Sequence, residues 1–555
     1  MIKKKFPKVL IVTGGLLNAD EKSVWNALKK QIKQIRAAKS HWLETKIKLV
    51  TSELILNSKL KKKSGKVAEY FNEPVSSIPE LTEVVLADLL KREGLEFEVM
   101  TYDLLFSDSK KAISLLKECP VVFASSTLLH DLSELLPLIK MLKTEDNKIV
   151  LGGALCGSLQ KQWEGDTMID IIAVGYGEFL VSVLADWIKS GFKDIKAPIQ
   201  GRLIQKTHSL FLFSGVPESK NLDFLPTPDW RVAEDYHQKK FKHIYYESVR
   251  GCPYRCSFCN YPFLFDDKKF RLKSADKIAA DWKYYHEELG VMHITCLDSL
   301  FTMPKNRLID LCKQLIKSKS KMTWTCYARA DDLADEDTVI LMKQAGAHQV
   351  QIGIESGNQF MLDQMNKRCT VEQNMEAIRN CRKHGVSTLI SLIVGYPGET
   401  EQTLNDTLEF MRVAKPDFHF LATFSVRIEE VPMFNVYNKE RFGLEKMDNP
   451  YSFAPYWRHH TMSCSEVGEH VRKLGMTLCK ERISLDGALF YQNIINYHPS
   501  MREDFLDYQK ELGEGNKILK PIFNGLNNWV DRNLKKDIEK VFPVSNQVPA
   551  ETSLQ

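Results

Sequence analysis

The chain is predicted to be an α/β protein with two parallel sheets and a smaller, mainly helical C-terminal segment. Three observations predict this class. Short apolar runs alternate with helical patterns over residues 1–205, and the same alternation returns over 241–430. In addition, 555 residues exceed the usual size of a single hydrophobic core. We therefore expect domains at 1–205, 241–430 and 431–555, with a linker at 206–240.

Five apolar runs supply the strands of the first, open sheet, and helices are expected between them in a doubly wound arrangement. One helix is expected at 83–92, closed by Gly94, and another at 132–142. Residues 18–77 separate the first strand from the next helix, and we expect a helical insertion there. The five strand runs are 8–13, 95–102, 120–125, 148–151 and 169–174.

The second α/β region begins at about residue 241 and repeats strand–helix units. Ser274 is a candidate N-cap and Gly290 a candidate end for its first helix. Such repeats favour a parallel, partial six-stranded barrel, whose chemistry belongs at the carboxyl ends of the strands. Further strands are expected at 293–297, 322–327, 350–354 and 387–394, and further helices at 306–317, 335–345 and 371–384.

Three cysteines, Cys252, Cys256 and Cys259, lie on one short segment with C-x3-C-x2-C spacing. Three thiolates can hold three irons of a 4Fe-4S cluster and leave the fourth iron without a protein ligand. A zinc site is the alternative, but zinc sites normally close with a fourth ligand at short spacing. The next cysteine is the distant Cys296. The spacing therefore indicates a cluster with an iron open to a substrate or cofactor.

Polar residues follow several of the expected barrel strands. Asp298, Arg329 and Glu355 each come at a strand end, and Gly395-Tyr-Pro-Gly-Glu-Thr400 follows another strand. A carboxylate suits ribose hydroxyls or an ammonium group, and a glycine-rich turn lets backbone donors approach a cofactor. Taken singly, each charged residue could equally be a helix cap or a surface charge. Their common position favours a shared site.

Small residues also follow the strands of the first sheet, where ligands of open α/β sheets bind. Any strand–helix turn can use glycine, so these loops do not identify a ligand by themselves. No G-x-G-x-x-G and no Walker lysine occur in them, which disfavours a dinucleotide or ATP.

The cysteine segment, with its strand-like lead-in 243–248 and Phe258 before the last cysteine, resembles the signature of the radical S-adenosylmethionine (SAM) superfamily. In that family SAM chelates the open iron. Gly353–Gly357 and Gly395–Thr400 are similar to its SAM-binding motifs. The resemblance implies that Phe258 contacts adenine and Glu355 the ribose or amino group. The implied SAM-binding residues are Phe258, Asp298, Arg329, Glu355, Ser391, Gly395, Pro397, Gly398 and Glu399.

Residues 150–154 and 173–179 resemble the Rossmann-like cobalamin-binding domain that precedes the radical SAM core in one class, and 221–230 resembles its connector. No D-x-H-x-x-G motif is present, so the resemblance implies cobalamin without a lower histidine ligand. Cys156 is expected to be a buried hydrophobe rather than a cobalt ligand. The implied cobalamin-binding residues are Gly14, Gly15, Leu16, Ser125, Ser126, Thr127, Leu128, Gly152, Gly153, Ala154, Gly175, Tyr176, Gly177 and Glu178.

This resemblance implies a class B radical SAM methyltransferase. A 4Fe-4S cluster would cleave SAM to a 5'-deoxyadenosyl radical, and methylcobalamin would methylate an unactivated carbon, or a phosphinate phosphorus, of a small-molecule substrate. A cobalamin-dependent radical SAM enzyme that rearranges, cyclises or oxidises its substrate would share every motif. A non-enzymatic cobalamin or iron–sulfur sensor is a third reading, weakened because sensing would not require SAM-pocket motifs.

The C-terminal segment contains Tyr456-Trp-Arg-His-His-Thr-Met462, which looks like a W-x-H-x-T-M pattern found after the barrel in some cobalamin radical SAM proteins. Trp457, His459 and His460 are candidate substrate residues, with packing and capping as the alternative. A helix is also expected near 521–534.

The composition narrows the classes of protein, partner and location that remain. Hydrophobic residues at 44% and charged residues at 26% are ordinary for a globular protein, and a net charge of +5 is small for this length. We expect no nucleic-acid partner. No apolar run approaches the ~20 residues of a membrane span. Twelve cysteines without disulfide-scaffold spacing suit a reducing, cytoplasmic location. A flavodoxin or ferredoxin is the expected type of electron donor.

Overall fold

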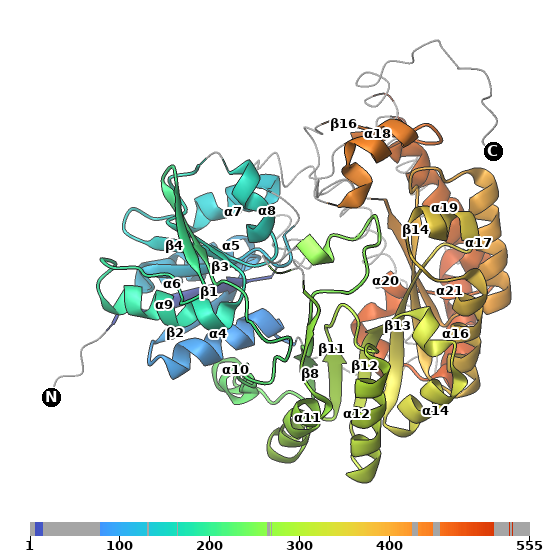
Figure 1. Ribbon diagram of the computed structural model, residues 1–555, viewed down its shortest axis with the longest axis horizontal. Coiled ribbons are helices and arrows are strands. Elements are labelled where there is room, and N and C mark those ends of the chain that lie inside the picture. Colours follow the sequence, from blue (N-terminus) through green and yellow to red (C-terminus); the bar gives the residue numbers. More distant parts are fainter. Residues whose placement is uncertain are drawn as a thin grey trace.

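The computed structural model forms two lobes, each built around its own sheet (Figure 1). The predicted α/β class is confirmed. The expected insertion at 18–77, the expected helix near 521–534, and residues Gly15 and Leu16 lie outside the described residues. The structure describes residues 6–14, 78–129, 132–163, 165–263, 267, 269–424, 431–447, 456–514, 532 and 536.

The first sheet has the strand order β2-β1-β3-β4-β5-β7-β6. All five predicted strands are present and parallel, and the sheet then continues through a hairpin in which β6 is antiparallel to β7. It therefore ends at residue 213, beyond the expected limit of 205. The strands are β1 Val9–Thr13, β2 Phe97–Thr101, β3 Val121–Ser125, β4 Lys148–Gly152, β5 Ile171–Val174, β6 Arg202–Lys206 and β7 Ser209–Phe213.

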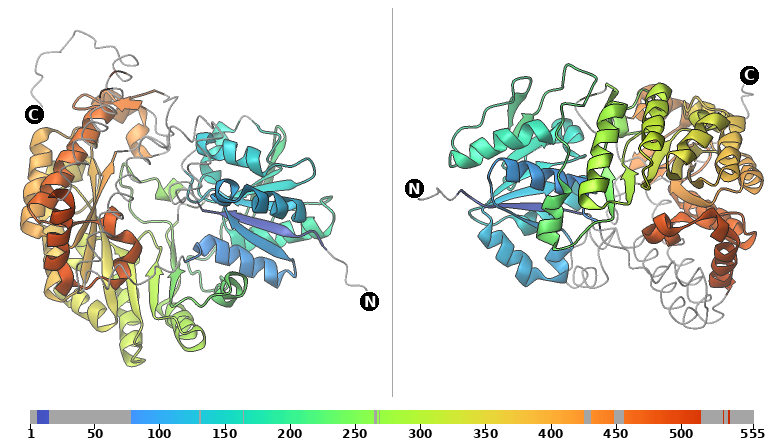
Figure 2. Two further views of the ribbon diagram at one scale, coloured as in Figure 1. Left: turned by 180° about the vertical axis from the view of Figure 1, so that it is seen from behind. Right: turned by 90° about the horizontal axis from the view of Figure 1, so that it is seen from below.

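Helices cover both faces of this sheet, as the doubly wound prediction requires (Figure 2). Alternate side chains of β1 show this directly: Val9 and Ile11 pack with one set of helices, and Leu10 and Val12 with the other. One face carries α4 Leu81–Arg92 and α9 Gly177–Lys189. The other carries α5 Leu104–Ser107, α6 Ser109–Glu118, α7 Leu132–Leu142 and α8 Cys156–Gln162.

The expected linker at 206–240 is more regular than predicted. It contains β7 and also helix α10 Trp230–His237, whose N-cap Asp229 accepts a hydrogen bond from the backbone N–H of Arg231 at 3.1 Å. The prolines before Asp229 had suggested irregular structure, but they precede the helix rather than interrupt it. Val232 packs in the first lobe and Trp230 in the second, so α10 joins the two cores.

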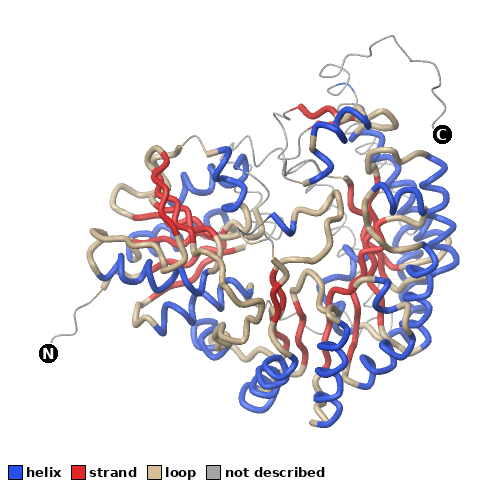
Figure 3. The backbone as a smooth tube through the Cα atoms, in the orientation of Figure 1, coloured by secondary structure: helices blue, strands red, loops and turns tan. Residues whose placement is uncertain are grey.

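The second sheet has the order β18-β15-β14-β13-β12-β11-β8, and every neighbouring pair is parallel. Six of its strands fall within the expected barrel region, and β18 is added from the C-terminal segment. Figure 3 shows the strands of the two lobes as separate red groups. The strands are β8 His243–Tyr246, β11 His293–Cys296, β12 Thr323–Ala328, β13 Ala347–Glu355, β14 Ser387–Val394, β15 Phe418–Thr423 and β18 Leu485–Asp486.

Two short antiparallel pairs stand outside these sheets. Strand β9 Val249–Arg250 pairs with β10 Arg271–Leu272 at the base of the cysteine segment. Strand β16 Glu445–Met447 pairs with β17 Tyr456–Arg458 in the C-terminal region.

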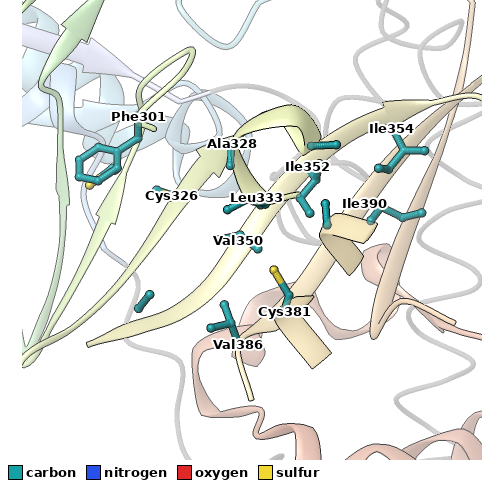
Figure 4. Packing of buried hydrophobic residues seen from close by; sticks show 14 of the residues in the cluster. Phe301, Cys326, Ala328, Leu333, Val350, Ile352, Ile354, Cys381, Val386 and Ile390 are labelled. Atoms are coloured by element: carbon teal, nitrogen blue, oxygen red, sulfur yellow. The ribbon is translucent and has the colours of Figure 1, made fainter. Parts of the chain in front are cut away.

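The barrel helices begin and end largely where their capping residues predict. Ser274 Oγ accepts from Lys277 N at 3.1 Å, and Gly290 ends that helix with a φ of +71°. Figure 4 shows Val350, Ile352 and Ile390 of the strands packed with Leu333 and Cys381 of the covering helices. These helices are α11 Ala275–Leu289, α12 Lys305–Lys317, α13 Ala330–Leu333, α14 Glu336–Gln344, α15 Gln359–Gln364, α16 Val371–Lys383 and α17 Glu401–Ala414.

The C-terminal segment is mainly helical, as predicted, and packs on the second lobe (Figure 1). Its helices are α18 Val436–Phe442, α19 Cys464–Lys480, α20 Gly487–Phe490 and α21 Arg502–Glu514, and the short 3-10 turns of the second lobe are η2 Tyr261–Phe263, η3 Pro432–Phe434, η4 Tyr491–Asn496 and η5 Pro499–Met501. Among the helices of the described residues, none has the length and apolar character needed to cross a membrane.

Candidate functional site

The three cysteines of the C-x3-C-x2-C spacing lie on the segment 251–263, which we call the cysteine loop. Cys252, Cys256 and Cys259 are all partly exposed and none forms a disulfide. No group of three or more His, Cys, Asp or Glu side chains in the described part of the chain could hold a metal ion. A 4Fe-4S cluster takes one thiolate per iron, so its ligands need not converge on one point. The donor set therefore fits such a cluster.

Hydrogen bonds with Met365, Tyr396 and Met433, from three other segments of the second lobe, hold the cysteine loop in place. Ser257 donates its backbone N–H to Met365 O at 2.9 Å, and its hydroxyl lies 2.6 Å from the Tyr396 hydroxyl. Ser257 O accepts from Met433 N at 2.9 Å. Ser257 is buried between two cysteines, so these bonds fix the loop while its thiols stay accessible. Tyr396 belongs to the glycine-rich turn after β14, which ties that turn to the cysteine loop.

A buried ion pair lies beside the loop. Lys367 Nζ contacts Glu355 Oε1 at 2.8 Å, and the same ammonium lies 6.0 Å from the ring centre of Phe258. Burial alone would lower the pKa of Lys367, but the Glu355 carboxylate reverses this and raises it above its usual value. A Cβ on Gly353 would lie 2.3 Å from Glu355 Oε1, so the glycine makes room for the pair.

The electrostatic surroundings of the thiols explain how they can serve as ligands. Burial raises the pKa of Cys259 to about 11 and also raises that of Cys256. The cations Lys367 and Arg329 oppose this effect at Cys256. Burial thus favours the protonated thiols of Cys256 and Cys259, and cluster binding would displace the proton of Cys256 next to two compensating positive charges.

Two of the expected SAM-binding residues make contacts in or next to the cysteine loop. The Asp298 carboxylate accepts from Ser248 N at 2.6 Å and Val249 N at 2.9 Å, and it also accepts from the Ser248 hydroxyl. Arg329 donates to Lys367 O at 2.7 Å and lies 3.7 Å from the ring centre of Tyr254. Both side chains are buried and occupied by protein groups. Asp298 therefore holds the backbone just before the cysteine loop, and Arg329 contacts the loop at Tyr254. Contact of either residue with SAM stays a prediction.

The turn after β14 has the backbone geometry that its glycines predict. Gly395 and Gly398 have φ values of +85° and +93°, a region that favours glycine. Buried Glu399 accepts a hydrogen bond from Gly395 N, and burial raises the pKa of Glu399 to about 7. Pro397 lies in the same turn, and Ser391 lies half-buried on β14 before it. The turn therefore stands at the carboxyl end of the barrel, beside the cysteine loop.

The candidate substrate residues of the C-terminal segment have other partners. His459 Nε2 lies 3.1 Å from Gly395 O, and Trp457 stacks on the His459 ring with the two planes 13° apart. Both side chains are buried. His460 is exposed, and its ring packs so closely on Gly443 that a Cβ at that position would clash with it. The packing alternative thus describes Trp457 and His459 better than contact with a substrate.

The strand ends of the first sheet form an exposed edge lined by small groups. Thr127, Leu128 and Gly153 are exposed there, and a Cβ on Gly153 would lie 2.7 Å from Thr127 N. Ser126 Oγ bridges these loops by donating to Gly152 O at 2.7 Å. The strand order reverses around β1, whose last residue precedes Gly14, so the edge includes a topological switch point. Ser125, Ala154 and Gly177 also belong to this edge.

Cys156, near the same edge, is fully buried within the first lobe. Burial raises the pKa of its thiol to about 12. Both facts agree with the expected hydrophobic role.

The turn Gly175–Glu178 is part of this edge, but its two long side chains point to the second lobe. Tyr176 donates its hydroxyl to Asp267 Oδ2 at 2.8 Å. Glu178 accepts two hydrogen bonds from Arg250, at 2.6 and 3.0 Å. Burial opposes ionisation of Glu178, yet Arg250 holds the pKa of its carboxyl below the usual value. Tyr176 and Glu178 were expected to bind cobalamin; the contacts assign their side chains to the joint between the lobes.

Several site residues escaped sequence reasoning. Lys367 follows a short helix rather than a strand, so no strand-end signal marks it. Ser257 and Tyr396 belong to motifs that were found, but their contact joins residues 139 positions apart. Arg307 reaches from α12 to the Ser248 hydroxyl at 3.2 Å and was not recognised, because only its burial distinguishes it from a surface arginine.

Comparisons with known proteins agree with this arrangement. Residues 246–411 match the model of the Radical SAM superfamily. The chain is 27% identical over 320 residues to an uncharacterized methyltransferase of Pyrococcus horikoshii, a match covering 57% of this chain and 69% of the relative. It is 31% identical over 209 residues to the anaerobic magnesium-protoporphyrin IX monomethyl ester cyclase of Rubrivivax gelatinosus, covering 36% of this chain and 37% of the relative.

A solved structure shares the fold of both lobes. The radical S-adenosylmethionine methyltransferase TsrM of Kitasatospora setae, with cobalamin and a 4Fe-4S cluster bound, superposes with a TM-score of 0.58 at 14% identity. The match covers 80% of this chain and 98% of that protein.

Proposed function

We propose that this chain is a cobalamin-dependent radical SAM methyltransferase acting on a small molecule, because residues 246–411 match the model of the Radical SAM superfamily. When bound, the 4Fe-4S cluster and SAM would supply radical chemistry, and cobalamin would supply the methyl group. Cys252, Cys256 and Cys259 would hold three irons of the cluster. The first lobe would bind cobalamin and the barrel would bind SAM and substrate.

One observation carries this proposal: the glycine-edged strand ends of the first sheet contact β9, the strand that leads directly into the cysteine loop. Glu178, at the end of the β5 turn, binds Arg250 two residues before Cys252. Methyl transfer would require two cofactors at a short distance from one substrate, because the methyl donor and the radical act on the same atom. A shared edge between the two lobes supports such an arrangement.

Within the barrel, the residues proposed to contact SAM are those that border the cysteine loop and the glycine-rich turn. The backbone of Gly395 to Gly398 would approach the nucleoside, because glycine leaves it uncovered. Glu355 would orient a hydroxyl or amino group while Lys367 compensates its charge. Phe258 would stack on the adenine. The proposed SAM contacts are thus Phe258, Glu355, Ser391, Gly395, Pro397, Gly398 and Glu399.

In the first lobe, cobalamin would lie over the exposed edge formed by Thr127, Leu128 and Gly153. A planar ring of that size needs small residues beneath it, which this edge offers. The proposed contacts are Gly14, Ser125, Ser126, Thr127, Leu128, Gly152, Gly153, Ala154, Gly175 and Gly177.

Anaerobic reconstitution tests the cluster assignment. The protein is loaded with iron, sulfide and hydroxocobalamin, and then given labelled SAM and a reductant. Wild type is expected to bind iron and form 5'-deoxyadenosine, whereas Cys256→Ala should lose both. Cys464→Ala is the matched control, because Cys464 is also partly exposed but lies outside the loop. Equal deoxyadenosine formation by wild type and Cys256→Ala would refute the assignment.

A second candidate function is favoured by the 31% identity to a cyclase, whose printed name describes ring formation rather than methyl transfer. S-adenosylhomocysteine distinguishes the two, because methyl transfer through cobalamin consumes a second SAM as methyl donor. With substrate present, deoxyadenosine with S-adenosylhomocysteine supports methyl transfer. Deoxyadenosine alone supports the alternative.

A cytoplasmic location and an external electron donor complete the proposal. None of the twelve cysteines forms a disulfide, which suits a reducing compartment. A flavodoxin or ferredoxin would reduce the cluster. Deoxyadenosine formation with either protein in place of a chemical reductant tests the donor.

A further inference from the structure

We propose that the turn Gly175–Glu178 of the first lobe is a clamp that positions the cysteine loop, with Tyr176 and Glu178 as its two arms. This proposal rests on the proposed function in one respect: the proposed function places cobalamin at the same edge of the first sheet. The contacts themselves join two segments 72 residues apart and do not depend on any cofactor.

The cysteine loop leaves and re-enters the barrel through a single narrow base. Strand β9 precedes the loop and β10 follows it, and Arg250 stands directly opposite Arg271 in their antiparallel pair. A Cβ on Gly251 would lie 2.2 Å from Lys269 O, so the two ends of the segment cross at close range. A group that holds both β9 and β10 therefore fixes the two ends of the segment that carries the loop.

One arm of the clamp grips β9. Arg250 donates to both Glu178 oxygens, at 2.6 and 3.0 Å, and to Glu247 Oε2 at 2.8 and 3.0 Å. The Arg250 guanidinium also lies 4.7 Å from the ring centre of Tyr176. The Glu178 contact is bidentate, which sets both the distance and the angle between the two elements. Glu178 is only 9% exposed and Arg250 only 16%, so water competes little for these bonds.

The other arm grips β10. The Tyr176 hydroxyl donates to Asp267 Oδ2 at 2.8 Å, and Asp267 in turn accepts from Arg271 Nε on β10. Tyr176 and Arg271 are buried. The two arms thus come from positions 176 and 178 of one turn and reach both strands at the base of the loop.

The turn that carries the arms is itself fixed. Tyr176 N donates to Ser214 Oγ at 2.9 Å, and Ser214 N donates to Val174 O at 3.0 Å. Gly175 has a φ of +107°, and a Cβ there would lie 2.2 Å from Ser214 Oγ. A rigid turn can transmit the position of the first sheet to the cysteine loop. The distance between the two proposed cofactor sites would then be set by Tyr176 and Glu178.

The test uses the full chain, reconstituted with iron, sulfide and hydroxocobalamin. Glu178→Gln keeps the shape of the side chain and removes its charge, while Glu247 still compensates Arg250. Backbone amide exchange in a peptide spanning residues 249–262 should become about tenfold faster, since a hydrogen bond to a charged group is weakened. The affinity for hydroxocobalamin should stay within about twofold of wild type, and methylated product per deoxyadenosine should fall about tenfold.

Glu93→Gln is the matched control. Glu93 pairs at 3.0 Å with Lys189, which lies in the same helix as Glu178, α9, but away from the cysteine loop. It should leave all three measurements unchanged. Tyr176→Phe removes only the hydroxyl of the second arm and should shift exchange in the same direction by a smaller factor. It also carries the test if Glu178→Gln does not fold.

Two results would overturn the clamp. Unchanged exchange together with a cobalamin affinity about tenfold weaker would make Glu178 a cofactor ligand instead. Unchanged values of all three quantities would remove any positioning role. If wild type neither binds cobalamin nor methylates a substrate, the proposed function fails, while the exchange measurement still decides the clamp.

Discussion

His459 Nε2 donates a hydrogen bond to Gly395 O at 3.1 Å, so a buried histidine of the C-terminal segment holds the glycine-rich turn of the barrel. The opposite ring nitrogen, Nδ1, accepts from Met462 N at 3.3 Å. A carbonyl can only accept and a backbone N–H can only donate, which assigns the neutral ring with its proton on Nε2. Burial agrees with this state, because it lowers the pKa of His459 to about 4.

We predict that His459→Phe destabilises the second lobe by about 1–3 kcal/mol, because Gly395 O and Met462 N lose their buried partner. The phenyl ring can still stack on Trp457, so packing is largely retained. SAM affinity should fall with the loss of the turn geometry. Thermal unfolding and equilibrium dialysis with labelled SAM measure the two effects. The exposed neighbour provides the control His460→Gln, and equal behaviour of the two variants would contradict the assigned bond.

The other side of the same turn is held by Glu399, and its titration predicts a pH dependence. Its pKa is about 7 in the folded protein and 4.5 in the unfolded chain. Between these values the folded protein binds a proton that the unfolded chain has lost, so stability from this group falls as the pH rises from 4.5 to 7.

Glu399→Gln keeps an oxygen that accepts from Gly395 N and removes the titration. The variant should therefore be more stable than wild type at pH 8, by up to about 3 kcal/mol, and this advantage should shrink toward pH 5. Chemical denaturation at the two pH values measures the difference. Glu401→Gln, on the exposed first turn of α17, is the control. An advantage of equal size at both pH values would show that Glu399 does not titrate in this range.

Asp298 offers a test between a direct SAM contact and a supporting role. Asp298→Asn keeps Oδ1 as the acceptor of Ser248 N and Val249 N, but its amide nitrogen replaces the oxygen that binds the Ser248 hydroxyl, and the negative charge beside Arg307 is lost. We expect a loss of about 2–3 kcal/mol in stability, since hydrogen bonds to a charged group are weakened. The SAM affinity of the folded variant should stay within about twofold of wild type.

Asp276→Asn, at the exposed start of α11, is the matched control and should change neither quantity. A large loss of SAM affinity at unchanged stability would indicate that Asp298 binds SAM directly, as the sequence predicts.

The sequence predicted the parallel strands of both lobes well, because strands buried on both faces appear as apolar runs such as Val121–Ser125. It missed the hairpin β6–β7, although β7, Ser209–Phe213, is itself a buried apolar run. The first strand of the hairpin gives no such signal. Arg202–Lys206 is an exposed, polar edge strand whose pairing depends on the tight turn that follows it. The chain therefore adds a strand pair beyond the expected end of the first sheet.

For the site, the sequence could place residues at strand ends but not decide what each side chain contacts. Glu355 and Gly395 lie at the carboxyl end of the barrel as expected, since strand topology alone determines that position. By contrast, the partners of Asp298, Glu178 and His459 come from other elements of the fold. Such pairings arise from tertiary packing, for which a single sequence carries no local signal.

The last prediction concerns the Lys367–Glu355 pair, where both side chains are less than 10% exposed. Lys367→Met leaves the Glu355 carboxylate buried without its cation, which should cost about 3–5 kcal/mol. The double variant Lys367→Met with Glu355→Gln removes the stranded charge and should recover about half of this loss or more. Thermal unfolding of wild type, both single variants and the double variant gives the interaction energy, expected at about 2 kcal/mol or more. The exposed pair Lys305–Asp335, with its N–O distance of 2.6 Å, is the control cycle and should give less than about 1 kcal/mol. Additive effects of the two changes at 355 and 367 would mean that Lys367 and Glu355 do not stabilise each other.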